Sequence, residues 1–250
     1  MSRFQIFTDD EVASLRKGGK ILHDCLEHVA ALVEPGITTG FLDSMAETFI
    51  RDRGGIPGFK GYQGYPATLC TSKNDICVHG IPGTEELKEG DIISIDCGVV
   101  LDGLNTDACV TVPVGAISPL AQRLMAASKD ALTEAVAVVK AGVHVGDISA
   151  TVERVARSRG FSPVRALTGH GLGTILHQYP DIPNVGMAKT GPVLPAMTLI
   201  AIEPIISAGS DAILEGDDGW AIYTKDHALI AHFEHTLLVL PEGNEVMTGG

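Results

Sequence analysis

The chain has 250 residues, of which 45% are hydrophobic and 20% charged, and its formal net charge is −13. This composition is typical of a soluble globular protein and excludes a fibre or a disordered chain. The negative charge repels phosphate backbones and anionic lipid surfaces, so we expect no binding to free nucleic acid or to membranes. A chain of this length can bury a sizeable core as a single domain over 1–250.

The opening sequence MSRFQIFTDDEVASL has no apolar stretch typical of an export signal. No apolar run approaches the roughly 18 residues of a membrane span. The five cysteines form no C-x-x-C pair, which indicates free thiols in a reducing compartment. We therefore expect a cytoplasmic protein.

Helical spacing of apolar residues predicts a first long helix after Thr8, which has the spacing of a capping box with Glu11. A second helix is expected over about 42–53, with Thr38 or Thr39 near its cap. A loop rich in Gly, Pro and Tyr follows this helix.

The second half of the chain echoes this organisation. Sliding the sequence by 106 positions lays PGITTGFLDSMAETFIRDRG on AGVHVGDISATVERVARSRG, and residues 120–140 form the counterpart of the first helix. We therefore expect one domain built from two similar halves, about 8–113 and 114–240.

Several apolar segments predict strands that join the two halves into one mixed sheet with helices on a face, an α+β fold. SIDCGVVLDGLNTDA, for example, has the pattern of a strand, a turn and a second strand. The strands are expected near 67–72, 91–101, 105–112, 162–166, 198–206, 220–223 and 228–240.

Four acidic residues lie inside these apolar segments: Asp96, Asp107, Glu203 and Glu234. Burying an isolated carboxylate is costly unless a cation compensates it or its pKa rises. Lys and Arg are absent from these segments, so metal ions are the expected counter-charge, and two divalent cations would balance four carboxylates. Such ligation suits Mn, Fe, Co or Zn, which often occur in pairs in hydrolases.

Imidazoles for such a site occur next to glycines. His170 lies in GHG, where the backbone can turn closely, and His177 follows seven residues later. VHGIPG supplies His79. Each of these residues taken alone fits an ordinary structural role at least as well, and only the joint occurrence of the four acids favours a metal site.

Several residues near the acids are interpreted as structural. Cys97 alternates to the face opposite Asp96, so a packed thiol is expected there. His235 alternates away from the last of the four acids. The same structural role is assigned to His227 and His232.

The ordered set Asp96, Asp107, His170, Glu203 and Glu234 resembles the ligand set of the type I methionine aminopeptidases, which are M24 metallopeptidases. The resemblance covers nearly the whole chain and includes GYQGYPATLC, VHGIPG, IDCGVVLDG, GHGLGTILHQYPDIPN, AIEP, DGWAIYTKD and FEHT. It implies a duplicated pita-bread fold with an antiparallel-rich curved sheet, and a hydrolase that removes the initiator Met when the next residue is small.

The resemblance also implies roles for these residues. Asp96 would bind one of two divalent ions, His170 and Glu203 mainly the other, and Asp107 and Glu234 would bind or bridge both. Glu203 would in addition act as the general base for the water that the two ions activate.

His79 and His177 match two catalytic histidines of the family that are not ligands. His177 would donate to the developing oxyanion, and His79 would form a hydrogen bond near the scissile nitrogen. The pocket for the Met side chain would be lined or bordered by Tyr62, Tyr65, Cys70 and Trp220.

The chain departs from the family pattern at a few positions near the expected pocket. Leu167 replaces a frequent aromatic residue or Met, and Val78 stands where some members carry Cys. The frequent aromatic-His-Gly before Asp107 is replaced by Leu104, Asn105 and Thr106.

The substrate implied by the resemblance is the N-terminal Met of nascent polypeptides, for a monomer that associates transiently with the ribosome. Two other functions remain open. One is a peptidase of the same fold that cleaves before proline, although such enzymes usually carry an additional N-terminal domain. The other is a non-catalytic binder at the ribosome or on RNA, although such proteins tend to lose the metal ligands.

Overall fold

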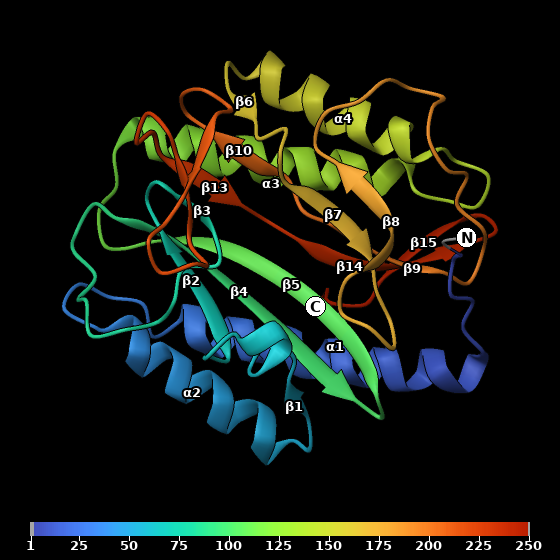
Figure 1. Cartoon of the computed structure of the whole chain (residues 1–250), viewed down its shortest axis with the longest axis horizontal. Coiled ribbons are helices and arrows are strands. Elements are labelled where there is room, and N and C mark those ends of the chain that lie inside the picture. The colour runs from blue at the N-terminus through green and yellow to red at the C-terminus, as the bar shows by residue number, and fades with distance from the viewer. Residues whose placement is uncertain (1–2, 250) are drawn as a thin grey trace.

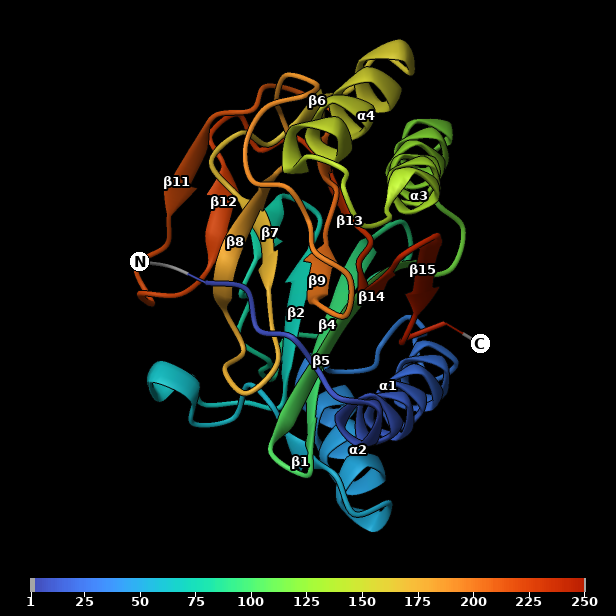
Figure 2. The same ribbon diagram turned by 90° about the vertical axis from the view of Figure 1, so that its right-hand side faces the viewer.

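Two pairs of helices lie on one side of a layer of strands in the computed structural model, which describes residues 3–249 (Figures 1 and 2). One pair is α1 (Asp9–Ala30) and α2 (Thr39–Asp52), and the other is α3 (Pro119–Val138) and α4 (Val145–Ser158). The pairs lie at opposite ends of the strand layer. A short 3₁₀ turn, η1 (Tyr62–Gly64), lies in the expected Gly/Pro/Tyr loop.

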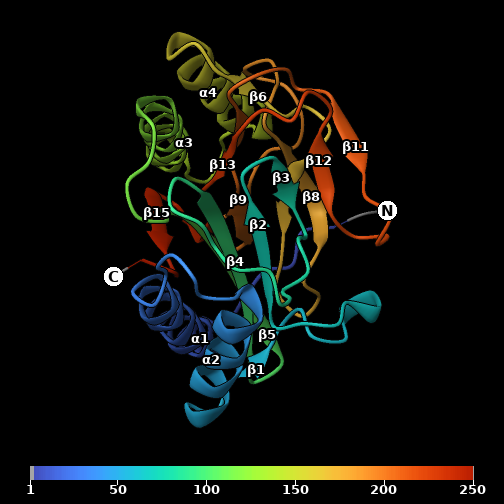
Figure 3. The same ribbon diagram turned by 90° about the vertical axis from the view of Figure 1, so that its left-hand side faces the viewer.

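Every strand pairing among residues 3–249 is antiparallel, and the strands form four hydrogen-bonded sheets. The strands are β1 (Ile56–Pro57), β2 (Leu69–Lys73), β3 (Ile76–Val78), β4 (Ile92–Leu101), β5 (Leu104–Pro113), β6 (Ser162–Pro163), β7 (Thr168–Gly171), β8 (Gln178–Pro183), β9 (Leu199–Ile202), β10 (Ile205–Ser207), β11 (Ile213–Glu215), β12 (Ile222–Thr224), β13 (Ile230–His232), β14 (His235–Leu240) and β15 (Gly243–Val246). Strands β8, β11 and β12 lie on the side of the layer away from α1 and α3 (Figures 2 and 3).

Side-chain caps determine where the first two helices begin. The Thr8 hydroxyl accepts a hydrogen bond from Glu11 N, and the Glu11 carboxylate accepts one from Thr8 N at 2.7 Å, which confirms the capping box. The Thr38 hydroxyl accepts from Phe41 N at 3.2 Å. This second cap starts α2 at Thr39, three residues earlier than the apolar pattern predicts.

Each helix pair buries its apolar face against a different group of strands. Leu22 of α1 and Leu42 of α2 pack with Ile95 of β4, whereas Ile148 of α4 packs with Ile200 of β9. All five side chains are fully buried, and each such burial stabilises the fold by about 1.5–3 kcal/mol.

Strands β4 and β5 form the longest uninterrupted ladder. Their register runs from Ile92 opposite Pro113 to Leu101 opposite Leu104. Asp102 and Gly103 make the turn with φ angles of 52° and 79°, the left-handed pair that a two-residue hairpin requires. The strand, turn and strand expected from the sequence are confirmed.

The prediction of one mixed sheet is wrong, because two long apolar segments break in the middle. The segment 198–206 is divided into β9 and β10 at Glu203 and Pro204, and 228–240 is divided into β13 and β14 at Phe233 and Glu234. At each break the chain changes sheets, since β9 pairs with β14 and β10 pairs with β13. Pro204 has no N–H to continue a ladder.

Two other features bear on the expectations. All five cysteines are buried free thiols, and Cys97 packs on the side of β4 that faces α1 and α2, as predicted. No helix within residues 3–249 is long and apolar enough to cross a lipid bilayer.

Candidate metal centre

The five predicted metal ligands, the two predicted catalytic histidines and the four predicted pocket residues all line one cavity of about 390 Å³. The cavity lies where the strands that pack against α1 and α2 meet the strands that pack against α3 and α4. Residues more than 100 positions apart in the sequence therefore share one site.

Asp96 and Asp107 enter the cavity from the β4–β5 ladder. Asp96 is paired with Cys109 and Asp107 with Gly98, so the two carboxylates are diagonal neighbours on one face. The Thr236 hydroxyl fixes the backbone of Asp107 from β14: it accepts from Asp107 N at 2.9 Å and donates to Asp107 O at 2.7 Å.

Glu203 and Glu234 enter the cavity where the strands break. Glu203 follows β9 directly and Glu234 lies between β13 and β14. Glu234 N donates to Cys109 O at 2.9 Å, which joins this break to β5. The Glu234 side chain is buried, and that of Glu203 is 12% exposed.

His170 lies inside β7, so the expectation of a close turn at GHG is wrong. A Cβ at Gly169 would lie 2.3 Å from Ala201 O, and one at Gly171 would lie 2.2 Å from Tyr179 O. Glycine is therefore required on both sides of His170 because the neighbouring strands approach the backbone closely.

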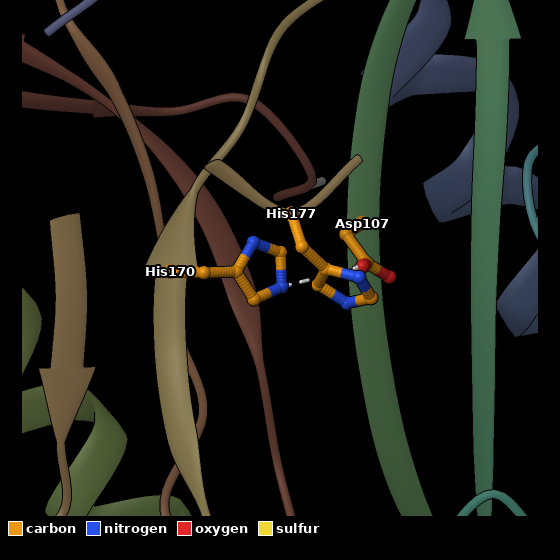
Figure 4. A group of neighbouring side chains, drawn as sticks. All are labelled: Asp107, His170 and His177. Atoms are coloured by element: carbon orange, nitrogen blue, oxygen red, sulfur yellow. Dashed lines mark ion pairs between the residues drawn. The ribbon is translucent and has the colours of Figure 1, made fainter. Parts of the chain in front are cut away.

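The His170 ring is oriented for ligation through Nε2. Its Nδ1 lies 3.0 Å from Gly171 O, an arrangement in which Nδ1–H donates and Nε2 is left free. Nε2 lies 3.8 Å from Asp107 Oδ2 and 3.7 Å from Glu203 Oε1. Figure 4 shows His170, His177 and Asp107 pointing towards one another.

Burial and mutual repulsion shift the pKa of every predicted ligand away from the charged form. Burial raises the pKa of Asp96 to about 7. The pKa values of Asp107, Glu203 and Glu234 are also raised, first by burial and then by the neighbouring carboxylates. Burial, with a smaller effect of His177, lowers the pKa of His170 to about 3.

The donor groups fit divalent metal. Three of them hold a buried oxygen atom without a hydrogen-bond partner: Oδ1 of Asp96, Oδ1 of Asp107 and Oε1 of Glu234. The residues described as lining the cavity include no Lys or Arg that could neutralise these carboxylates. A bound cation would satisfy the orphaned oxygens and return the acids to their charged forms.

The side chains group in a way that allows more than one ion. Ligand atoms lie within 4.8 Å of one another in three sets: Asp107, His170 and His177; His170, Glu203 and Glu234; and Asp96, Asp107 and Glu234. Three residues belong to two sets each: Asp107, His170 and Glu234. The two carboxylates among them are the residues expected to bridge.

His79 reaches the cavity from a strained turn after β3. Its φ of 61° lies in the left-handed region, which non-glycine residues rarely adopt. A Cβ at the next residue, Gly80, would lie 2.4 Å from Thr71 O, so the turn fits tightly against β2. Burial lowers the pKa of His79 and keeps its ring neutral.

His177 lies at the mouth of the cavity. Its ring meets that of His170 edge-on at 4.3 Å between centroids, and its Nδ1 lies 3.3 Å from the Tyr62 hydroxyl. Its pKa is lowered to about 4, first by burial and then by His79.

The loop that carries His177 is held from two sides. The side-chain amide and backbone N of Asn105 both donate to Gly173 O, at 2.7 and 2.8 Å. Gln5 Oε1 accepts from Thr174 N at 3.2 Å and from the Gln178 side chain at 3.2 Å. Asn105, one of the departures from the family pattern, therefore contacts the loop that carries His177.

An apolar slot adjoins the carboxylates. The rings of Tyr65 and Trp220 meet edge-on at 5.0 Å, and the Cys70 thiol, whose pKa burial raises, lies beside them. The Tyr65 hydroxyl lies 2.9 Å from Leu69 O, which anchors the ring. The slot includes two residues that the predicted site lacked, Phe59 and Leu176. Leu167, one of the departures expected near the pocket, also lines the cavity.

Sequence reasoning also misplaced His232. The structure buries it with Nε2 3.8 Å from Glu203 Oε2 and 3.7 Å from Glu234 Oε2, so it belongs to this centre. The signal was available: His232 precedes Glu234 by two positions, and period-two alternation favours a common face.

Comparison with known proteins agrees with this donor set. Residues 13–241 match metallopeptidase family M24. The chain belongs to this family. A methionine aminopeptidase of Clostridium perfringens is 42% identical over 240 residues, which are 96% of each chain. Methionine aminopeptidase 1 of Bacillus subtilis is 39% identical over 241 residues, covering 96% of this chain and 97% of the relative.

Solved structures of other peptidases share the fold of this M24 metallopeptidase. The methionine aminopeptidase of Rickettsia prowazekii superposes with a TM-score of 0.97 at 35% identity, covering 99% of this chain and all of the relative. Prolidase from Pyrococcus furiosus gives 0.77 at 18% identity, and the match spans 98% of this chain but 65% of the prolidase. The expected α+β pita-bread fold is confirmed, and the M24 metallopeptidase is a divalent-metal enzyme.

Proposed function

We propose that this metallopeptidase is a methionyl aminopeptidase that removes the N-terminal Met from polypeptides whose second residue is small. The observation that carries the proposal is the convergence of four carboxylates and His170 beside an apolar slot in one cavity. The names of the relatives with 42% and 39% identity support the same activity.

We propose two divalent ions at this centre, of Co, Mn, Fe or Zn. Asp96 would hold one ion, His170 and Glu203 mainly the other, and Asp107 and Glu234 would contact both. When bound, such ions supply Lewis acidity that activates water and polarises a carbonyl.

The protein groups have distinct roles in the proposed reaction. Glu203 takes up the proton of the attacking water and passes it to the leaving amine. A neutral imidazole can donate an N–H, so His177 would stabilise the developing oxyanion and His79 would bind near the scissile nitrogen. The lowered pKa values of both histidines support this neutral state.

The apolar slot would hold the Met side chain. An unbranched thioether adapts to an irregular cavity and makes favourable contacts with aromatic ring edges. Tyr65 and Trp220 present such rings, Cys70 adds a polarisable thiol, and Tyr62 borders the slot at its His177 end.

We further propose that the chain is one catalytic domain with halves at about 8–113 and 114–240. It would act as a cytoplasmic monomer on nascent polypeptides, with transient association at the ribosome. The net charge of −13 supports the absence of binding to free nucleic acid.

Peptide hydrolysis tests the proposal. Purified protein loaded with Mn²⁺ or Co²⁺ is expected to release Met from Met-Ala-Ser and to leave an Ala-Pro peptide intact, and a chelator is expected to stop the reaction. Cleavage of X-Pro bonds alone would make the chain a prolidase-like peptidase. Absence of chelator-sensitive turnover on both peptides would favour a non-catalytic binder.

A further inference from the structure

His232 lies behind the carboxylates of the metal centre and not in the cavity. Glu203 and Glu234 both line the cavity, whereas His232 does not, and its side chain is 2% exposed. Its Nε2 has no hydrogen-bond partner, although it faces one oxygen of each glutamate. A buried polar atom without a partner needs a reason, because it forgoes its bonds to water.

Two imidazoles flank Glu203 on opposite oxygens. His170 Nε2 faces Oε1 at 3.7 Å from the cavity side, and His232 Nε2 faces Oε2 at 3.8 Å from behind. His232 also faces Oε2 of Glu234 at 3.7 Å, while Oε1 of Glu234 has no partner. The oxygens left for metal are thus separate from those that face His232.

The backbone of His232 is fixed by the ladder that carries the two aspartates. The Thr111 hydroxyl of β5 accepts from His232 N at 2.8 Å and donates to His232 O at 2.7 Å. Ser94 of β4 lies 2.9 Å from the same hydroxyl and donates to it, because the Thr111 hydrogen is already used. This series of hydrogen bonds gives the imidazole a defined position relative to the metal centre.

We propose that His232 is a positioning residue whose Nε2–H donates to the rear oxygens of Glu203 and Glu234 and turns their other oxygens towards metal. Both glutamates lie at breaks between strands, so no ladder of their own fixes their side chains. One donor that bridges them therefore couples the orientation of two ligands. The inference rests on the proposed metal centre but not on the identity of the substrate.

The test compares Mn²⁺ and Co²⁺ affinities, measured by titration calorimetry, between the unaltered protein and the variants His232→Leu and His232→Gln. We expect His232→Leu to lower affinity by about 10–100-fold, as is typical of lost partners of metal ligands. His232→Gln keeps a side-chain N–H and should stay within a few-fold. The visible spectrum of the Co²⁺ protein should be unchanged in His232→Gln, since no ligand is lost.

His235 supplies the matched control. It follows Glu234 directly and is also a partly buried imidazole, but its Nδ1 contacts Thr248 Oγ1 at 2.9 Å, away from the centre. His235→Leu should leave metal affinity unchanged. If His232→Leu does not fold, His232→Asn replaces it, because its shorter amide cannot span both glutamates and should bind metal more weakly than His232→Gln.

Two results would overturn the proposal. Affinity within two-fold of the unaltered protein in His232→Leu would make the residue merely structural. Equal losses in Leu and Gln variants, with a changed Co²⁺ spectrum, would make it a metal ligand instead. Hydrolysis of Met-Ala-Ser is measured separately. If the protein does not hydrolyse this peptide but His232→Leu still lowers metal affinity as expected, the proposed activity fails and the positioning role stands.

Discussion

The two pairs of carboxylates at the metal centre are held in different ways. Asp96 and Asp107 belong to one hairpin whose register is unbroken from Ile92 to Pro113. Glu203 and Glu234 lie where strands end and the chain changes sheets. The first pair is positioned by the backbone pairing of this ladder, and the second pair by single contacts.

The contacts at the breaks come from distant elements. Ser128 of α3 donates to Pro204 O at 2.8 Å, beside Glu203, and Cys109 of β5 accepts from Glu234 N at 2.9 Å. Short aspartates suit a rigid ladder, whereas longer glutamates reach the same cavity from its margins. The aspartates are therefore oriented by the ladder itself, whereas the glutamates depend on side-chain contacts such as the one proposed for His232.

Glu203→Gln should have the largest effect on catalysis. The amide cannot accept the proton of the attacking water, so we expect kcat on Met-Ala-Ser to fall by about 10²–10⁴-fold. Circular dichroism should be unchanged. Glu245→Gln, which alters only an exposed pair with Arg16, is the control. A near-normal kcat in Glu203→Gln would mean that the general base lies elsewhere.

Asp107→Asn tests the ladder side of the comparison. Asp107 belongs to two of the three ligand sets and Asp96 to one. We therefore expect Asp107→Asn to lower Mn²⁺ affinity by more than about 100-fold, beyond the usual effect of a residue that only supports ligands. Asp96→Asn should lower Mn²⁺ affinity by a smaller factor in the same calorimetric titration. The reverse order would contradict a bridging role for Asp107.

His79→Ala separates catalysis from ligation. The imidazole is proposed to donate to the substrate, and it belongs to none of the three ligand sets described. We therefore expect kcat to fall by about 10²-fold while bound metal is unchanged. Metal content, measured by atomic emission after dialysis, decides the case. Loss of metal would identify His79 as a ligand.

Asn105→Ala should have a smaller effect on the reaction. The variant removes one of two hydrogen bonds to Gly173 O, so the loop that bears His177 gains freedom. We expect a few-fold loss of kcat with little change in KM or metal affinity. An unchanged kcat would show that the Gln5 contacts are sufficient to position the loop.

Of the predicted effects, the pH dependence of the stability of the metal-free protein should be the smallest. The raised pKa values of the four acids mean that the native state keeps protons that the unfolded chain releases, so this contribution to stability is lost as pH rises. The lowered pKa values of the buried histidines act in the opposite direction, but only below about pH 6.5.

Between pH 7 and 8 we therefore expect the Tm of metal-free protein to fall by a few degrees. Saturating Mn²⁺ should remove this slope, because it holds the carboxylates charged. Asp96→Asn should reduce the slope without metal, since the pKa of Asp96 rises to about 7. A Tm that rises over this range would contradict protonated acids in the metal-free fold. Differential scanning calorimetry provides the measurement.

The sequence by itself determined the helices and the β4–β5 hairpin, and it predicted a metal site from the four acids in apolar segments. The full set of five ligands was implied only by the family resemblance. Local signals suffice for these features: a capping box at Thr8, a left-handed turn at Asp102 and Gly103, and acids in apolar segments without basic partners. These are properties of neighbouring residues or of composition, and they do not depend on distant contacts.

Only the tertiary structure decided the breaks at Glu203 and Glu234, the strand position of His170 and the role of His232. An apolar run does not reveal where a chain changes sheets, because the partner strand is far away in sequence. The glycines beside His170 are required by carbonyl groups of β8 and β9, which no local pattern encodes. His232 acquires its role because β13 places it behind two glutamates, and that geometry arises only when the strands assemble.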